Sequence, residues 1–524
     1  MISTLILITT FLNAQSPFAR ADDRIQERLR QMLDTPASVT GPVSLDLKSV
    51  TLAAMMRSDS FRSLLAKHLA IDTDRLEQES ATDAFAFAQV RQEWNRNQPN
   101  SLFGTNRFDQ TNVDIGIEKK LGTGTRMSLG LSEYRNDSEF GSFGNINTKV
   151  AGGRLTLSQS LWRDSFGSTT RNMIQAGKIK SEAKRLLIES EVEEWFIQLT
   201  QLYHQVWLAQ RRIESTRSSL TRKERLAVLF ERRKALGISE ESEQIQIESA
   251  VTQTRLQLDE FERLLKKQWN LLVISLKLNE EDRRTDPMHI PVLLPPAVPA
   301  SDTECSKPIE QNRDLRQIDQ ELKAMEIETR AAVDQTSPEL SLDLGLSTNG
   351  SVLNSMDDFN SRWSNALRAR NPAYTIGLSL RLPLDASREQ AQILGSLSMA
   401  SQLESRANDL KARLNSNLET ICSEITMLDR HHQLYSNLEQ DMKKRFQLEE
   451  LRYKQARTTP FTVLQAGDEL YASGLSLDQT LTERWSRHWT TKKINGTLFN
   501  ELEGWIRQKT GRSFNEIANS RRTP

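Results

Sequence analysis

Residues 396–459 have the sequence SLSMASQLESRANDLKARLNSNLETICSEITMLDRHHQLYSNLEQDMKKRFQLEELRYKQARTT. The stretch contains neither Gly nor Pro, the two residues that most reliably interrupt a helix. Its apolar residues recur at alternating steps of three and four, which is typical of the seam of a coiled coil. At 1.5 Å per residue, a helix of this length would reach on the order of 90 Å. The seam residues are Leu403, Ala407, Leu410, Leu414, Leu418, Ile421, Ile425, Leu428, Tyr435, Leu438, Met442 and Phe446.

The composition of the 524-residue chain argues against several classes of protein. Lys plus Arg and Asp plus Glu both number 69, so the formal net charge is zero and no nucleic-acid partner is expected. Mean hydropathy is -0.55, and no uncharged apolar run reaches the roughly 20 residues of a transmembrane helix. Cys305 and Cys422 are the two cysteines, and their number and spacing predict neither a disulfide framework nor a metal site.

The amino terminus is predicted to be a secretory signal. Leu5 and Leu12 bound a short apolar core, and Ala14 or Ala19 could precede the cleavage site. The first basic residue is Arg20, so the segment lacks the usual positive start, and a short buried helix is the alternative. We assign residues 1–21 to the signal and residues 22–43 to a polar amino-terminal arm.

The remainder is interpreted as an internal duplication of helix, strand pair and long helix pair. Each half begins with a helix. In the first half, the whole run of residues 44–98 has helical apolar spacing and no Gly or Pro. The predicted boundaries are residues 44–286 for the first repeat (strand pair about 111–162, helix pair 178–286), 287–308 for a Pro-rich linker, 309–496 for the second repeat (strand pair about 339–384, helix pair 386–495) and 497–524 for a carboxy-terminal tail.

In both predicted strand pairs the apolar period changes to two. Leu340, Leu342 and Leu344, for example, alternate with Ser341 and Asp343. Segments of about ten residues with one apolar and one small or polar face are typical of transmembrane β-barrels. Four strands per chain cannot close a barrel of useful bore, so several chains would have to combine their strands. A water-facing sheet packed on helices is the alternative.

From about residue 44 to residue 495 the sequence resembles the TolC-like outer-membrane efflux and secretion channels. The resemblance is carried by Leu157-Ser-Gln-Ser-Leu161, Gly377-Leu-Ser-Leu-Arg-Leu-Pro-Leu384, Asn312-Arg-Asp-Leu-Arg316, Arg233-Lys-Ala-Leu-Gly-Ile-Ser239, and Arg452-Tyr453 followed by Val463-Leu464-Gln465-Ala466. It implies an α+β membrane protein: a homotrimer whose twelve-stranded transmembrane β-barrel, four strands per chain, continues into a long antiparallel α-helical coiled-coil barrel.

The resemblance also implies a location and partners. The barrel would contact lipid in the outer membrane of a Gram-negative-type cell, with the helical part in the periplasm. A periplasmic adaptor (membrane fusion) protein and an inner-membrane pump would be the protein partners. The adaptor-contacting turns would be at Leu236, Gly237 and Ile238 in the first repeat and at Ala456 and Thr458 in the second.

The same resemblance places a periplasmic gate at Tyr453, Arg457, Thr462 and Gln465. The family commonly has Tyr, two residues, Gly, five residues, Asp-Val-Leu, one residue and Ala at this turn. Here Tyr453 matches and Arg457 lies close to the position of a gate arginine, but Ala456 takes the Gly place.

The acidic positions of the gate pattern are changed as well. Thr462 takes the Asp place, and Gln465 stands where some members carry a second Asp. The usual ring of aspartates is therefore absent, and Asp468 and Glu469 lie further along. We expect either that hydrogen bonds and packing hold the constriction closed or that its selectivity for cations is weaker.

No pattern in the sequence predicts an enzyme, a cofactor or a metal site. His431 and His432 are adjacent, so on a helix they point to different faces and have no third ligand at helical spacing. Gly122-Thr-Gly124 is interpreted as a turn between strands, since no helix follows it. We predict a passive exit duct of a tripartite efflux or type I secretion system. The alternative is a structural coiled-coil envelope protein without transport activity. Drug, metal and protein cargo are equally compatible with the sequence.

Overall fold

The computed structural model describes residues 46–96, 105–140, 144–235, 240–277, 292, 305–353, 359–368, 372–382, 384, 387–511, 513, 514 and 516. The predicted signal, the amino-terminal arm, most of the Pro-rich linker and the turn at Leu236, Gly237 and Ile238 lie outside these ranges. The chain forms two compact units. The sheet unit comprises Ile71–Lys184 and Gln317–Asn408, and the helical unit comprises the described residues of Met1–Ala70, Arg185–Arg316 and Asp409–Pro524.

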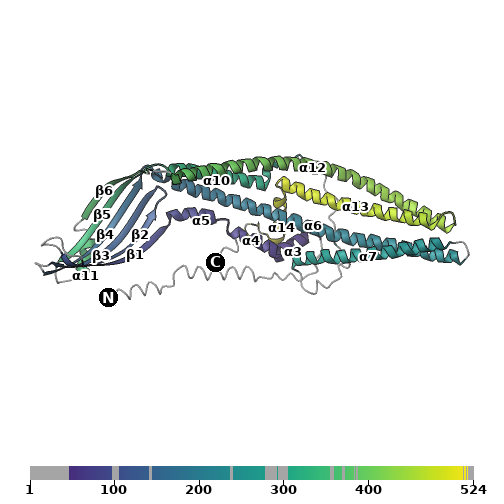
Figure 1. Ribbon diagram of the computed structural model, residues 1–524, viewed down its shortest axis with the longest axis horizontal. Coiled ribbons are helices and arrows are strands. Elements are labelled where there is room, and N and C mark those ends of the chain that lie inside the picture. Colours follow the sequence, from purple (N-terminus) through teal and green to yellow (C-terminus); the bar gives the residue numbers. More distant parts are fainter. Residues whose placement is uncertain are drawn as a thin grey trace. The chain divides into compact units, whose positions relative to one another are not determined.

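A six-stranded antiparallel sheet dominates the sheet unit, with its strands paired in chain order from β1 to β6 (Figure 1). Our expectation of four strands per chain is therefore wrong. The region predicted as one strand pair holds three strands, and β1 precedes them. The strands are β1 (Ala84–Asn95), β2 (Thr105–Lys120), β3 (Thr125–Phe140), β4 (Gly144–Ser160), β5 (Glu339–Leu353) and β6 (Pro372–Arg381).

Strand β1 corrects the prediction of a helix over residues 44–98. The helices there are shorter: α3 (Leu47–Arg57), α4 (Asp59–Leu69) and α5 (Thr73–Glu79). Phe85 and Phe87 alternate with Ala86 and Ala88, so the period of two was present in the sequence. The absence of Gly and Pro does not distinguish a helix from a strand, because both residues are depleted in strands as well.

One face of the sheet is apolar and exposed in the single chain. Ile117, Leu129, Leu155, Leu346 and Tyr374 lie opposite one another across five strands. Tyr374 is 77% exposed and Ile117 is 55% exposed. The period-two apolar pattern therefore does mark one face of a sheet, and no other described element buries these two side chains.

The connections of the sheet include a tight turn and a short helix. Gly122-Thr-Gly124 forms the predicted turn between β2 and β3, where the Gly124 amide donates to the Leu121 carbonyl oxygen at 2.9 Å. Gly124 has φ of +74°, which favours glycine. The connection between β5 and β6 contains helix α11 (Phe359–Leu367), which packs against β4 and β5.

Long helices connect the strands to the helical unit. Helix α6 (Ser168–Lys234) has 67 residues and α12 (Ser387–Lys454) has 68. Helix α6 begins ten residues before its predicted start at residue 178, whereas α12 begins one residue after its predicted start at residue 386. Each helix contains one glycine. The one in α6, Gly177, fits closely against α5, because a Cβ there would lie 2.8 Å from the Asp74 carbonyl oxygen. The partner helices are α7 (Glu241–Leu276) and α13 (Pro460–Ile494), and α10 (Arg313–Gln335) opens the second half.

An aromatic-rich core holds the helical unit together. Trp269, Phe196 and Trp489 are each less than 5% exposed and pack among α6, α7 and α13. The predicted carboxy-terminal tail contributes to this core, because it contains helix α14 (Leu498–Thr510), whose Leu498 and Leu502 are buried. No described helix is both long and apolar enough to cross a membrane.

A buried ion-pair cluster joins α6, α10 and the start of α14. The guanidinium of Arg313 lies 2.9 Å from Glu189 and 2.8 Å from Glu193, and it also donates to the Gly496 carbonyl oxygen at 2.7 Å. Glu193 accepts the backbone N–H of Phe499 at 2.9 Å. Burial raises the pKa of Glu193 to about 7, against the opposing effect of Arg313. One guanidinium therefore faces two carboxyl groups in the core.

Candidate functional site

The candidate site is the end of the helical unit at which the two helix hairpins turn. We call it the tip and define it as residues 222–235, 240–254 and 443–472. A small apolar cluster lies here, separate from the aromatic-rich core. It joins both hairpins, and its buried members are Leu226, Phe230, Ile247, Tyr453, Val463 and Leu464.

Tyr453, the predicted gate residue, lies in this cluster with an exposed fraction of 1%. The guanidinium of Arg233, near the end of α6, lies over the tyrosine ring at 4.6 Å from its centre. A cation at this distance from an aromatic face attracts it by about 1–2 kcal/mol where water is partly excluded. Burial raises the pKa of Tyr453, while Arg233 acts in the opposite direction. Tyr453 therefore links the two hairpins.

The turn after Tyr453 has a strained residue at its centre. The Ala456 amide donates to the Tyr453 carbonyl oxygen at 3.0 Å, and the Arg457 amide donates to the Arg452 carbonyl oxygen at 2.8 Å. This pair of bonds is a Schellman motif, which requires a left-handed residue after the helix. Ala456 occupies that place with φ of +61°. It therefore stands where the backbone favours glycine.

The other predicted gate residues do not converge on Tyr453. Arg457 and Gln465 are exposed, whereas Thr462 is half-buried at the start of α13. The hydroxyl of Thr462 lies 3.2 Å from that of Thr459, and Gln465 donates to Glu469 at 3.0 Å. Of the predicted adaptor-contacting residues, Ala456 is exposed and Thr458 is half-buried. The structure therefore separates a buried link at Tyr453 from a polar surface around α13.

The nearby acids are engaged within the chain. Asp468 lies 2.8 Å from the ammonium of Lys223, and Glu469 is ion-paired with Arg445. Both acids line a cavity of about 480 Å³ between α7 and α13, together with Gln246, Ala250, Phe461, Leu464, Gln465 and Ala472. Phe461 is 58% exposed there. The two carboxylates are held in ion pairs on a partly apolar surface.

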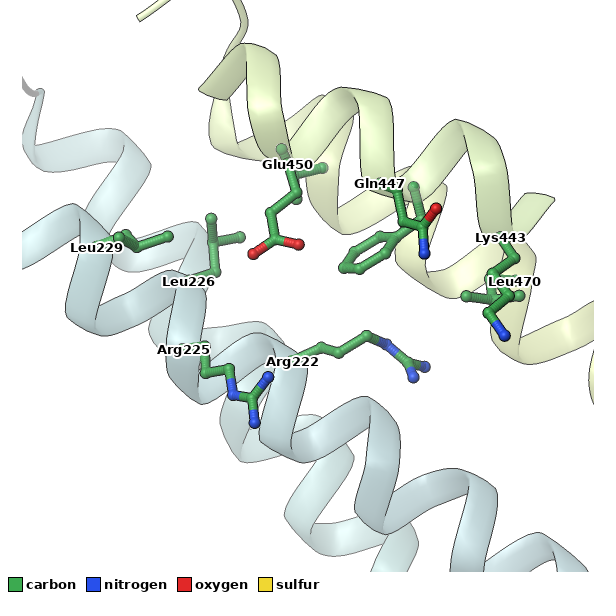
Figure 2. A pocket seen from close by; sticks show the side chains of 10 residues that line it. Arg222, Arg225, Leu226, Leu229, Lys443, Gln447, Glu450 and Leu470 are labelled. Atoms are coloured by element: carbon green, nitrogen blue, oxygen red, sulfur yellow. The ribbon is translucent and has the colours of Figure 1, made fainter. Parts of the chain in front are cut away.

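A second cavity lies on the side of the tip formed by α6 and α12 (Figure 2). It measures about 250 Å³, and its rim carries Arg225 and Lys443, both exposed. Arg222 extends from α6 into the space between the helices. Sequence reasoning missed this cavity, because its residues come from segments more than two hundred positions apart.

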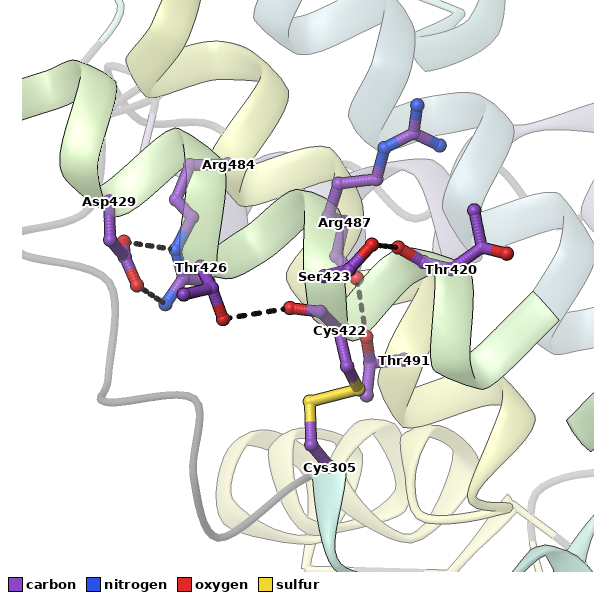
Figure 3. The surroundings of a disulfide bond; sticks show 9 residues. All are labelled: Cys305, Thr420, Cys422, Ser423, Thr426, Asp429, Arg484, Arg487 and Thr491. Atoms are coloured by element: carbon purple, nitrogen blue, oxygen red, sulfur yellow. Dashed lines mark hydrogen bonds and ion pairs between the residues drawn. A yellow bond between two sulfur atoms is a disulfide. The ribbon is translucent and has the colours of Figure 1, made fainter. Parts of the chain in front are cut away.

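A disulfide lies between Cys305 and Cys422 in the helical unit, with the Cα atoms 6.0 Å apart (Figure 3). The number and spacing of the cysteines did not predict this bond. A single pair separated by 117 residues leaves no spacing pattern, and only the fold brings the two cysteines together. The bond attaches the segment before α10 to the middle of α12. In the chain-entropy account, closing a loop of this length stabilises a fold by about 5 kcal/mol.

The adjacent histidines His431 and His432 lie in α12. The ring centre of His431 lies 6.1 Å from that of Tyr435, and His432 is exposed. Neither belongs to a group of three potential metal ligands in the described part of the chain. Arg233, by contrast, was noted in the sequence only as part of a turn motif. Its partner lies 220 positions away, so no local signal could have identified the pair.

Comparison with known proteins identifies solved structures that share the fold of this chain. No family model and no curated protein matches the sequence. Among solved structures, the chain is similar to the outer membrane protein VceC of Vibrio cholerae, with a TM-score of 0.64 and 13% identity over 86% of this chain and 96% of that one. The CmeC outer membrane channel of Campylobacter jejuni is similar with a TM-score of 0.63 and 13% identity, over 90% of this chain and 89% of that one. The MtrE outer membrane channel of Neisseria gonorrhoeae, in its open state, is similar with a TM-score of 0.60 and 15% identity, over 89% of this chain and 94% of that one. The fold is that of the TolC-like channels, as the sequence-level resemblance predicted.

Proposed function

We propose that the protein is a TolC-like outer-membrane exit duct, a passive export channel across the periplasm and outer membrane. The observation that carries the proposal is a sheet with an exposed apolar face, joined to long helix hairpins in a fold shared with outer-membrane channels. An exposed apolar face of this extent needs a partner or a lipid environment. A structural coiled-coil protein, the alternative, has no need for such a sheet.

We further propose that three copies close one barrel. Strands β1 and β6 are the two edges of the sheet, and within the described residues each pairs on one side only. Lipid cannot satisfy the open backbone groups of an edge strand, so β1 of one copy would pair with β6 of the next. Such a head-to-tail contact closes a ring when the rotation fits. Three copies of six strands would give an eighteen-stranded barrel, in place of the twelve strands implied by the resemblance.

The extra strands are compatible with the helices of such a duct. Four strands lie between α5 and α6, and two lie between α10 and α12. Both numbers are even, so in an antiparallel sheet the chain returns to the side from which it entered. The additional hairpin therefore leaves every long helix on one side of the proposed barrel.

Location and partners belong to the same proposal. Disulfides form and persist in oxidising compartments such as the periplasm, so the Cys305–Cys422 bond favours export of the helical unit. The tip would dock a periplasmic adaptor, which in turn would connect to an inner-membrane pump of a tripartite efflux or type I secretion system. We assign no catalytic role and no cofactor to the chain.

Two measurements test the proposal. The purified protein in non-ionic detergent should run as a trimer after cross-linking and should conduct ions in planar bilayers. Single cysteines placed along β1 and β6, on a background with both native cysteines replaced by Ser, should form bonds between copies and not within one. A monomer without conductance would favour the structural envelope protein. Bonds between copies that join β1 to β1 or β6 to β6 would contradict the head-to-tail eighteen-stranded arrangement.

A further inference from the structure

The cavity between α6 and α12 is short of negative charge. Arg222, Arg225 and Lys443 line it, against a single carboxylate, that of Glu450. Glu450 already has a partner outside the cavity lining, because the ammonium of Lys454 lies 3.1 Å from it. Arg225 and Lys443 make no ion pair within the described residues.

Of these three cations, Arg222 has the largest unfavourable effect on the free energy of folding, because it is the most buried. Its Nε is buried and has no hydrogen-bond partner in the described part of the chain, and only its Nη1 donates, to Ser218 at 2.9 Å. Burial lowers the pKa of Arg222, and the acid that opposes this effect, Asp468, is itself paired with Lys223 at 2.8 Å. A buried N–H without an acceptor, on a guanidinium without its own carboxylate, lowers the stability of the fold. A ligand that supplies an acceptor to Arg222 would recover this free energy.

The rest of the lining is apolar. Figure 2 shows Leu226 and Leu229 on the α6 side and Leu470 on the opposite side. The Phe446 ring lies 5.6 Å from the guanidinium of Arg222, so it contacts both the charged and the apolar part. Pockets that combine an apolar wall with a few placed polar groups are typical of small-molecule sites.

We propose that this cavity is a binding site for a small amphipathic organic anion, one chain binding one molecule. A carboxylate, sulfonate or phosphate head would lie among Arg222, Arg225 and Lys443, and an apolar body would lie against Leu226 and Leu229. The volume of about 250 Å³ accommodates a body of one or two rings or a short alkyl chain. Because α6 forms one wall and α12 and α13 the other, the bound molecule contacts both hairpins. The proposal does not depend on transport.

Isothermal titration calorimetry on the full-length protein in non-ionic detergent tests the site. The probes are 1-naphthalenesulfonate and octanoate, with 1-naphthalenemethanol as the uncharged analogue and inorganic phosphate as the head alone. We expect one site per chain for at least one amphipathic anion. The alcohol should bind at least about tenfold more weakly because it loses the hydrogen bonds to the charged groups, and phosphate should bind at least about tenfold more weakly because it loses the apolar contact. Binding of the sulfonate alone indicates an aromatic ligand, and binding of octanoate alone indicates a lipid-derived one.

Substitutions locate the binding. R222Q and K443Q should each weaken the anion about tenfold, whereas K444Q, which removes an exposed charge on the same helix outside the cavity lining, should leave it unchanged. Should R222Q fail to fold, K443Q still decides, since the Lys443 side chain is exposed. Absence of binding by every probe, or equal binding by K443Q and K444Q, overturns the proposal. Loss of the trimer in R222Q together with no binding by the parent protein would show that a second copy fills the cavity instead.

Discussion

The guanidinium of Arg233 lies 4.6 Å from the ring centre of Tyr453, and this contact joins α6 of one hairpin to α12 of the other. In the TolC-like pattern the acidic positions follow the tyrosine, at places that Thr462 and Gln465 take here. A basic residue against an aromatic face supplies an attraction of a different kind, in which no carboxylate takes part. The buried Tyr453 therefore contributes packing to the turn at which we propose the gate.

R233Q should loosen the tip. Loss of the cation over the ring removes about 1–2 kcal/mol of attraction between the hairpins. Hydrogen exchange of peptides around Tyr453 should then show a lower free energy of local opening. R232Q, at the neighbouring exposed position, is the matched control. Combining R233Q with Y453L should cost less than the sum of the single changes, and additive effects would show that the two side chains are not coupled.

A456G should stabilise the turn by about 1 kcal/mol, because alanine at φ of +61° bears a steric cost that glycine does not. A472G, at an exposed position inside α13, is the opposite control and should destabilise its helix by about 1 kcal/mol. Exchange rates of amides in the turn and in α13 measure both. A turn that exchanges faster in A456G than in the parent would contradict the assigned backbone conformation.

Stability should respond to pH through two buried groups of opposite sign. Glu193 has a pKa of about 7 in the folded chain and 4.5 as its ordinary value, so the folded state holds a proton that the unfolded state loses. Its contribution to stability therefore falls as pH rises from 4.5 to 7. Burial lowers the pKa of His204 to about 4, from an ordinary 6.5. Its contribution falls as pH drops from 6.5 to 4.

E193Q separates the two effects, because glutamine still accepts the N–H of Phe499 and carries no charge. Relative to the parent, E193Q should gain stability as pH rises from 4.5 to 7, by at most about 3 kcal/mol. H204Q should gain relative to the parent as pH falls from 6.5 to 4. Thermal unfolding at a series of pH values measures both differences. Parallel curves for parent and E193Q would show that Glu193 ionises in the folded state at its ordinary pKa.

Removing the disulfide should destabilise the helical unit. C305S, C422S and the double variant should lose the same amount, up to about 5 kcal/mol, because either change opens the same loop. A reductant should lower the unfolding temperature of the parent protein and leave the double variant unaffected. Alkylation of both cysteines in the folded protein without reductant would show that the bond does not form.

The long helices could be predicted because many apolar residues repeat the same heptad spacing along them. In α12, Leu414, Ile421 and Ile425 are buried at the spacing that the seam indicated. The start of α6 could not be predicted, since Gly177 lies inside the helix for a reason of packing that involves Asp74, a residue distant in sequence. A glycine in a long helix costs only about 1 kcal/mol, which the remaining residues easily exceed.

The contacts that define the tip could not be predicted in full. Tyr453 was identified through a resemblance, but Arg233 became relevant only when the fold brought α6 beside α12. The same holds for Cys305 and Cys422, since two cysteines define no pattern by themselves. Strand β1 is different, because its sequence alternates between apolar and small or polar residues and this alternation predicts a strand.

The turn that closes at Gly124 gives the sheet a property that the helices do not share. A hairpin ending in such a turn begins and finishes on the same side, so it can be inserted or lost as a unit without redirecting the chain that follows. The circumference of a barrel built from these chains could therefore change in steps of one hairpin per copy, at a constant number of helices. Pore width and tunnel architecture would then be independent variables in the evolution of such proteins.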